Sequence, residues 1–226
     1  MIKRATCLLW AGLLIAASGS PASTKKSAGD CDWSQDAVAR EAVKDREPSE
    51  GDDYKTIGSP SHPKSPAWWF DTVCTKWEPK VKDIDVGDDT DVLDLEEQQV
   101  TVTGWIVAVK FERNQDHDLH IELSGTKAWE PAGHLIAEVP GGEAFCDARQ
   151  TLWSLVSGDP NAHGDSFALQ NPVKVVVTGF VFFDSHHVGK TCEASGGRGI
   201  HGPDHEPPNV KTVWELHPVI ALSKAP

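Results

Sequence analysis

The alternation of apolar and polar residues predicts five strands in the second half of this chain of 226 residues. The predicted strands are Gln99–Phe111, His117–Ser124, Gly133–Val139, Asn171–Phe183 and Val213–Leu222. Between the third and fourth strands, Phe145, Ala148 and Leu152 recur at helical spacing and predict a helix over Phe145–Val156. Three strands, a helix and two strands is the order of an OB-type barrel. We therefore expect a mainly β fold, a five-stranded OB-type barrel with one helix between strands three and four.

The alternation also assigns side chains to the two faces of each strand. In the second strand the inward residues are Leu119, Ile121 and Leu123, and those on the other face are Asp118, His120 and Glu122. In the last strand the inward residues are Trp214, Leu216 and Ile220, and the outward ones are Glu215 and His217. Gly104 and Gly179 interrupt the two longest strands, where a barrel strand bends sharply.

The N-terminus has the pattern of a secretory signal peptide. Lys3 and Arg4 precede an apolar run, Cys7–Ala17, and small residues follow up to Ser23. The apolar run is too short for an ordinary membrane span. We therefore divide the chain into a signal peptide (1–22), an N-terminal extension with an acidic linker (23–98) and the barrel domain (99–226), and expect a secreted or periplasmic protein.

The extension is expected to be irregular apart from a short helix over Ser34–Lys44. Pro, Ser, Gly and charged residues dominate positions 48–66 and indicate a loop. The aromatic residues that follow are Trp68, Trp69, Phe70 and Trp77. We favour their packing onto the barrel over the alternative, a sugar or peptide site. Eight carboxylates between Asp83 and Glu97 lack the spacing of an EF-hand and indicate a solvated acidic linker.

Net charge narrows the class of partner. The formal charge is −13, and removal of Lys3 and Arg4 with the signal peptide makes it −15. Nucleic-acid affinity comes largely from Lys and Arg displacing counterions around phosphates. The charge therefore disfavours nucleic acid, a frequent ligand of OB folds.

Four cysteines remain after the signal peptide: Cys31, Cys74, Cys146 and Cys192. An even number in an oxidising compartment predicts two disulfides, for which three connectivities exist. We favour Cys31 with Cys74 and Cys146 with Cys192, because each pair then lies within one region of the chain. No CxxC spacing indicates a zinc site built on cysteines.

The predicted topology brings polar side chains to one rim of the barrel, between the strand 1–2 and strand 4–5 loops. This polar rim consists of Asp118, His120, Glu138, Asp184, His186, His187, Glu215 and His217. We expect Glu138 to pair with a residue of the second strand such as His120. We favour the interpretation that these groups hydrogen-bond to one another and to the backbone, and so hold the long insert before the last strand in place.

The alternative is a divalent metal such as zinc on the same rim, bound by His120, His186 or His187, and His217, with Asp118, Asp184 or Glu215 as ligand or orienting group. No HxH or HExxH motif supports a metal, and no GxSxG motif supports a serine hydrolase. Gly196, Gly197 and Gly199 match no phosphate-binding fingerprint and indicate a flexible loop. The sequence therefore favours a binding protein without cofactor over an enzyme.

Four segments, HDLHIEL, AEVP with Cys146 following, FFDSHH and WELHPV, carry a resemblance to a family. They resemble a family of uncharacterised exported bacterial proteins with OB-type barrels, which share a D-x-H second strand, an E-x-P third strand and a final E-L-H-P strand. The resemblance covers about 125 residues from Gln99 onward and implies the fold, with no particular activity. This chain departs from the pattern by a loop of roughly thirty residues before WELHPV and by Cys192.

From these observations we expect an exported binding module that uses the polar rim to bind a small molecule, a glycan or a protein partner. The alternative is a metal-dependent site on that rim, for which hydrolysis is one candidate activity.

Overall fold

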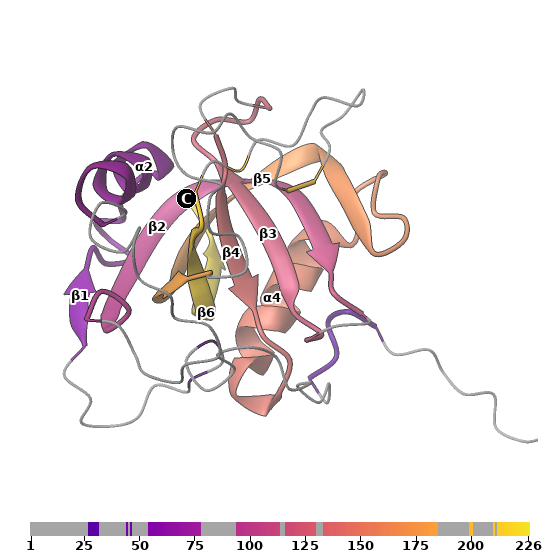
Figure 1. The fold of residues 1–226 in the computed structure, drawn as a ribbon. Helices are drawn as coiled ribbons and strands as arrows, with labels where there is room; N and C mark the ends of the chain where they lie inside the picture. The colour runs from indigo at the N-terminus through magenta and orange to yellow at the C-terminus, as the bar shows by residue number, and fades with distance from the viewer. Residues whose placement is uncertain are drawn as a thin grey trace, which may run out of the picture.

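The computed structural model describes residues 27–31, 44, 46, 54–77, 94–113, 116–129, 133–184, 199–200, 210 and 212–226. Its described elements, in chain order, are β1 (Lys55–Ile57), α2 (Pro66–Thr72), the π-helical turn η1 (Val73–Trp77), β2 (Gln98–Phe111), β3 (Leu119–Ser124), β4 (Leu135–Val139), the 3-10 turn η2 (Glu143–Phe145), α4 (Cys146–Val156), β5 (Ser166–Phe183) and β6 (Trp214–Lys224) (Figure 1). The protein is mainly β. All five predicted strands and the predicted helix are present in the predicted order.

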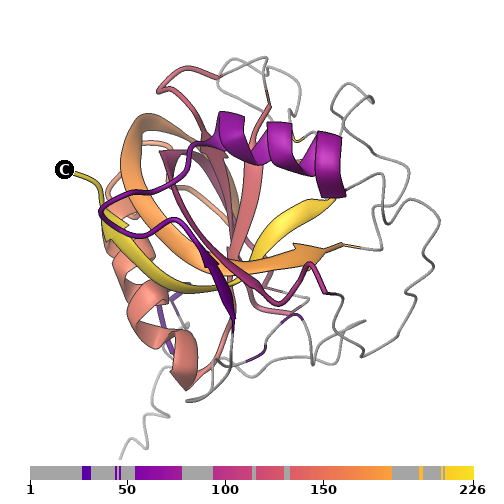
Figure 2. The same ribbon diagram turned by 90° about the vertical axis from the view of Figure 1, so that its left-hand side faces the viewer.

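Six strands form one mixed sheet in the order β1-β2-β3-β4-β6-β5, and β5 also pairs with β2. Strands β2, β3, β4, β6 and β5 therefore form a ring of five. The β4–β6 pairing is parallel, and the other four pairings within the ring are antiparallel. Figure 2 shows α2 lying across one side of the ring and α4 running along another.

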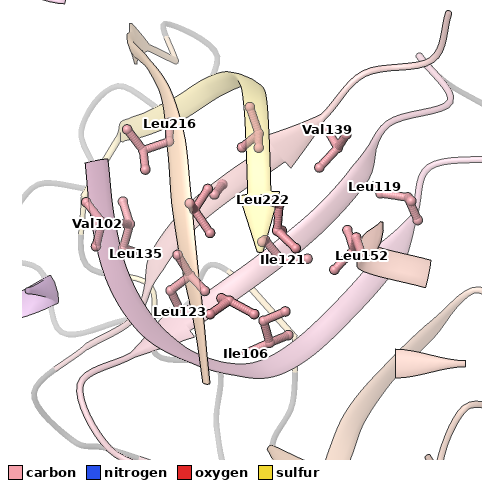
Figure 3. Close-up of a cluster of buried hydrophobic side chains, with 14 of the residues drawn as sticks. Val102, Ile106, Leu119, Ile121, Leu123, Leu135, Val139, Leu152, Leu216 and Leu222 are labelled. Atoms are coloured by element: carbon pink, nitrogen blue, oxygen red, sulfur yellow. The ribbon is translucent and has the colours of Figure 1, made fainter. Parts of the chain in front are cut away.

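The apolar residues of the ring pack against one another and against α4. Leu119, Ile121 and Leu123 of β3 are fully buried, as the alternation predicted, and Leu152 of α4 joins the same cluster (Figure 3). The predicted apolar side of the helix is confirmed, because Phe145, Ala148, Leu152 and Val156 are all buried. The strand periodicity of the sequence thus correctly identified the interior of the ring.

The N-terminal extension is more regular than the sequence predicted. Strand β1 pairs in parallel with the first residues of β2, and α2 begins after the N-cap Ser65, whose side chain accepts a hydrogen bond from the Trp68 N–H. The expected packing of the aromatic residues is confirmed: the Trp77 ring lies 5.4 Å from that of Trp69 and 5.7 Å from that of Trp214, between ring centres. The predicted helix over residues 34–44 lies outside the described residues except for Lys44, which is helical.

Two strand predictions were wrong in detail. Strand β5 begins at Ser166 rather than Asn171, because the segment around Pro172 bulges away from β2 while pairing resumes on both sides of it. Ile220 of β6 packs against the core but is only partly buried, whereas Val219 and Leu222 are buried. The pairing of β5 with β6 shifts register around Gly179, and a shift exchanges the two faces of a strand.

The predicted cysteine pairing was also wrong. Cys31 is bonded to Cys146 at the start of α4, at a sequence separation of 115, and Cys74 is also disulfide-bonded. Cys192 lies outside the described residues. The extension is therefore attached covalently to the helix of the domain that follows it, which proximity along the sequence did not indicate.

The end of the acidic segment does not belong to a solvated linker. Glu96 is fully buried, and its Oε1 accepts a hydrogen bond of 2.8 Å from the backbone N–H of Phe183 at the end of β5. This carboxylate joins the start of β2 to β5. Positions 83–93 of the predicted linker lie outside the described residues.

Candidate functional site

The outer face of β3, β4 and β6 carries a group of acidic and imidazole side chains. The β3–β4 register places His120 directly opposite Glu138, and β6 runs beside β4 with Leu216 opposite Ala137. Asp118, directly before β3, and His217 on β6 complete the group. We call Asp118, His120, Glu138 and His217 the buried cluster, because none of these residues is more than 8% exposed.

Short contacts join the members of the buried cluster. His217 Nδ1 lies 2.7 Å from Glu138 Oε2, and His217 Nε2 lies 3.3 Å from Asp118 Oδ2. On the other side, His120 Nδ1 lies 2.8 Å from Glu138 Oε1, which confirms the predicted pairing of these two residues. One carboxylate, Glu138, therefore lies between two imidazoles.

A cation from the extension reaches this cluster. Lys44 Nζ lies 3.0 Å from Asp118 Oδ2 and 3.7 Å from Glu138 Oε2, and it also contacts Asp116 Oδ2. The Lys44 side chain is 12% exposed. Sequence reasoning missed Lys44, because 72 residues separate it from Asp116 and no local pattern signals a partner so distant.

Burial and charge shift the pKa values in opposite directions at neighbouring positions. Burial raises the pKa of Asp118 to about 7, although His217 and Lys44 act to lower it. Burial would also raise the pKa of Glu138, but the charges of Lys44 and His217 and the bond from His120 hold it well below its usual range. The pKa of Lys44 is raised, because three carboxylates outweigh its burial. Glu138 is thus ionised at neutral pH, and His120 Nδ1 carries the hydrogen of their bond.

A second acid–imidazole pair extends the polar face along β3. Glu122 Oε2 lies 2.8 Å from His134 Nδ1, and Glu122 Oε1 accepts a hydrogen bond from the backbone N–H of Ile200. Gly199, with φ +110°, leaves no room for a side chain beside Glu122. Sequence reasoning missed His134, which precedes β4, although it follows the same alternation as Glu138.

Of the remaining residues of the predicted polar rim, the structure describes Asp184 and Glu215. Asp184 follows β5, and its backbone N–H bonds to the carbonyl of Val213. Glu215 is buried on β6, two positions before His217. His186 and His187 lie outside the described residues, as do most of the long loop and Gly196 and Gly197. Four residues of the predicted polar rim, Asp118, His120, Glu138 and His217, are buried.

Three residues of the buried cluster have the arrangement of metal ligands. One ligand atom from each of Asp118, Glu138 and His217 lies within 4.8 Å of the others. Two buried atoms of the cluster, Asp118 Oδ1 and His120 Nε2, have no hydrogen-bond partner among the residues that the structure describes. Two carboxylates and an imidazole are donors that suit zinc and other divalent transition metals.

Comparisons of the chain with protein-family models, with curated proteins and with solved structures gave no match. Among the described residues, no helix is both long and apolar enough to cross a membrane. The Cys31–Cys146 disulfide is consistent with an extracytoplasmic protein.

Proposed function

We propose that this chain is an exported binding module built on an OB-type barrel, and that its ligand is a divalent metal ion held by Asp118, Glu138 and His217. The ring of five strands with α4 between β4 and β5 supports the barrel. The N-terminal sequence pattern and the disulfide support export.

The observation that carries the proposal is the unpartnered Asp118 Oδ1 inside the buried cluster. A buried carboxylate oxygen without a donor costs free energy, which a bound cation offsets. Three carboxylates, from Asp116, Asp118 and Glu138, meet a single ammonium there, so the cluster has excess negative charge when the carboxylates are ionised and the imidazoles are neutral. A divalent cation neutralises that charge.

The surroundings of the ligands support a metal as well. His120 donates to Glu138 Oε1 and leaves Oε2 turned toward His217, which is how outer hydrogen bonds orient a ligating carboxylate. Asp118 and His217 have no exposed surface. Catalytic metal sites keep one position open to substrate, whereas structural sites are closed. Burial therefore favours metal binding without hydrolysis.

Metal analysis tests the proposal. The purified chain, stripped with a chelator and then titrated with zinc, is expected to bind one equivalent at this site and to unfold at a higher temperature; at a free zinc concentration of 100 Kd the gain is about 2.7 kcal/mol. The Asp118→Asn and His217→Ala variants are expected not to bind this equivalent of zinc. His163→Ala changes an exposed histidine outside the cluster and serves as the control.

Two results would overturn the proposal. One is a stripped wild-type chain that binds no zinc, manganese or nickel. The other is a bound equivalent that survives in both Asp118→Asn and His217→Ala, which would place the metal elsewhere in the chain.

A further inference from the structure

The ammonium of Lys44 contacts two of the three proposed metal ligands. Its Nζ lies 3.0 Å from Asp118 Oδ2 and 3.7 Å from Glu138 Oε2. The third carboxylate that it contacts, Asp116, is not a proposed ligand. Lys44 thus serves as the counter-ion for two of the carboxylates that a metal would use.

The ammonium and a metal cannot occupy this position together. Zinc–carboxylate bonds are about 2.0–2.2 Å long, so a metal bound through Asp118 Oδ2 would lie within about 5 Å of the present Lys44 Nζ. Like charges that close repel strongly where water is excluded. One of the two cations must leave.

We propose that Lys44 is an intramolecular competitor of the metal: it fills the site in the metal-free protein, and metal binding displaces it into solvent. This inference rests on the proposed metal site and names its regulation. The position of the Lys44 side chain is then linked to metal occupancy, because each excludes the other.

Arg46 shows how the displacement can stay local. Its guanidinium lies 4.6 Å above the ring of Phe180. It also donates to the backbone carbonyls of Glu96, directly before β2, and of Val181 on β5. None of these groups belongs to the buried cluster. Arg46 can therefore keep the segment attached to the ring while the Lys44 side chain moves out.

Amine labelling of the whole chain reports the position of Lys44 directly. With an acetylating reagent and mass spectrometry, Lys44 in the stripped protein is expected to react at least about tenfold more slowly than the exposed Lys127, because it is buried and ion-paired. Saturating zinc is expected to raise the Lys44 rate toward that of Lys127. In His217→Ala, which lacks a ligand, zinc is expected to change nothing.

A second measurement uses substitutions. Lys44→Gln removes the competing ammonium. The apparent Kd for zinc should then fall by the ratio of occupied to free sites in the metal-free wild type, about tenfold or more. Lys44→Arg keeps a competing cation and is expected to gain much less. Arg46→Gln is a control that leaves the carboxylates and their counter-ion in place.

The outcomes separate this inference from the proposed function. If zinc binds through His217 while the Lys44 labelling rate stays low, the competitor is disproved and the metal site stands. Equal zinc affinity in wild type and Lys44→Gln would also disprove competition by Lys44 and leave the metal site standing. If the stripped wild type binds no metal, the proposed function itself has failed.

Discussion

His120 and Glu138, directly opposite each other on β3 and β4, are joined by a hydrogen bond of 2.8 Å between His120 Nδ1 and Glu138 Oε1. Both side chains are buried, and the other oxygen of Glu138 lies 2.7 Å from His217 Nδ1. The position of Glu138 between the two imidazoles therefore depends on a donor from each side.

Removing the His120 donor is expected to destabilise the fold. His120→Ala leaves a buried carboxylate oxygen without its donor and should lower the free energy of unfolding by about 1–3 kcal/mol. Asparagine places an amide N–H near the position of Nδ1, so His120→Asn should lose less than half as much. Urea denaturation of the metal-free protein measures both; equal losses in the two variants would contradict a role for the hydrogen bond.

Substitution of Arg149 in α4 is expected to lower the free energy of unfolding more than substitution of any exposed residue of the same helix. Its guanidinium is fully buried and donates to the carbonyls of His117, Val139 and Pro140. Burial lowers its pKa to about 10, which leaves it charged at neutral pH. Arg149→Met removes all three bonds and should cost about 3 kcal/mol or more in urea denaturation.

Two variants calibrate that result. Arg149→Lys keeps the charge, but one ammonium cannot reach three carbonyls as a guanidinium does, so it should recover only a minor part of the loss. Ser154→Ala changes an exposed position of the same helix and should stay within about 0.5 kcal/mol of wild type. A loss for Arg149→Met as small as that of Ser154→Ala would show that the three bonds contribute nothing.

Asp159 is expected to give the fold a pH-dependent contribution. Its carboxylate accepts bonds from the backbone N–H groups of Asn161, Gln170 and Asn171, at the bulge of β5. Burial would raise the pKa of Asp159, but these bonds lower it below the ordinary 3.8. A lowered folded pKa stabilises the protein above the unfolded value, and that stability disappears as the pH falls through the folded pKa.

Asp159→Ala should therefore lose about 1–2 kcal/mol at pH 7. The difference from wild type should shrink steadily as the pH is lowered below about 4. Asp159→Asn keeps an acceptor without the charge, so it should be intermediate at pH 7 and insensitive to this titration. Urea denaturation at pH 7 and pH 3 measures all three proteins; a difference that grows on acidification would contradict the assignment.

The Cys31–Cys146 disulfide is expected to be a major source of stability. Closing a loop between cysteines at a sequence separation of 115 restricts the unfolded chain, and losing such a bond costs about 2–5 kcal/mol. The double variant Cys31→Ser, Cys146→Ser should show this loss. Peptide mapping without reductant should recover Cys31 linked to Cys146; a peptide linking Cys31 to Cys74 would contradict the pairing.

Much of the fold follows from local pattern. The direction of each side chain in a strand is set by the backbone, so alternation alone placed Leu119, Ile121 and Leu123 in the core. It also placed His120 and His217 on the opposite face. Irregular pairing near Pro172 accounts for the wrongly predicted start of β5, and the predicted starts of β3 and β4 differ from the observed ones by two residues each.

The sequence by itself therefore determined the strands, the helix and which polar residues share a face, because these depend on residues close along the chain. Only the tertiary structure decided that Lys44 neutralises Asp118 and Glu138, that Arg149 bonds three carbonyls and that Cys31 pairs with Cys146. Each of these contacts joins segments that are distant along the chain and come together only in the folded structure. The residues interact through charge, hydrogen bonding or a covalent bond, and none of these produces a periodic pattern in the sequence.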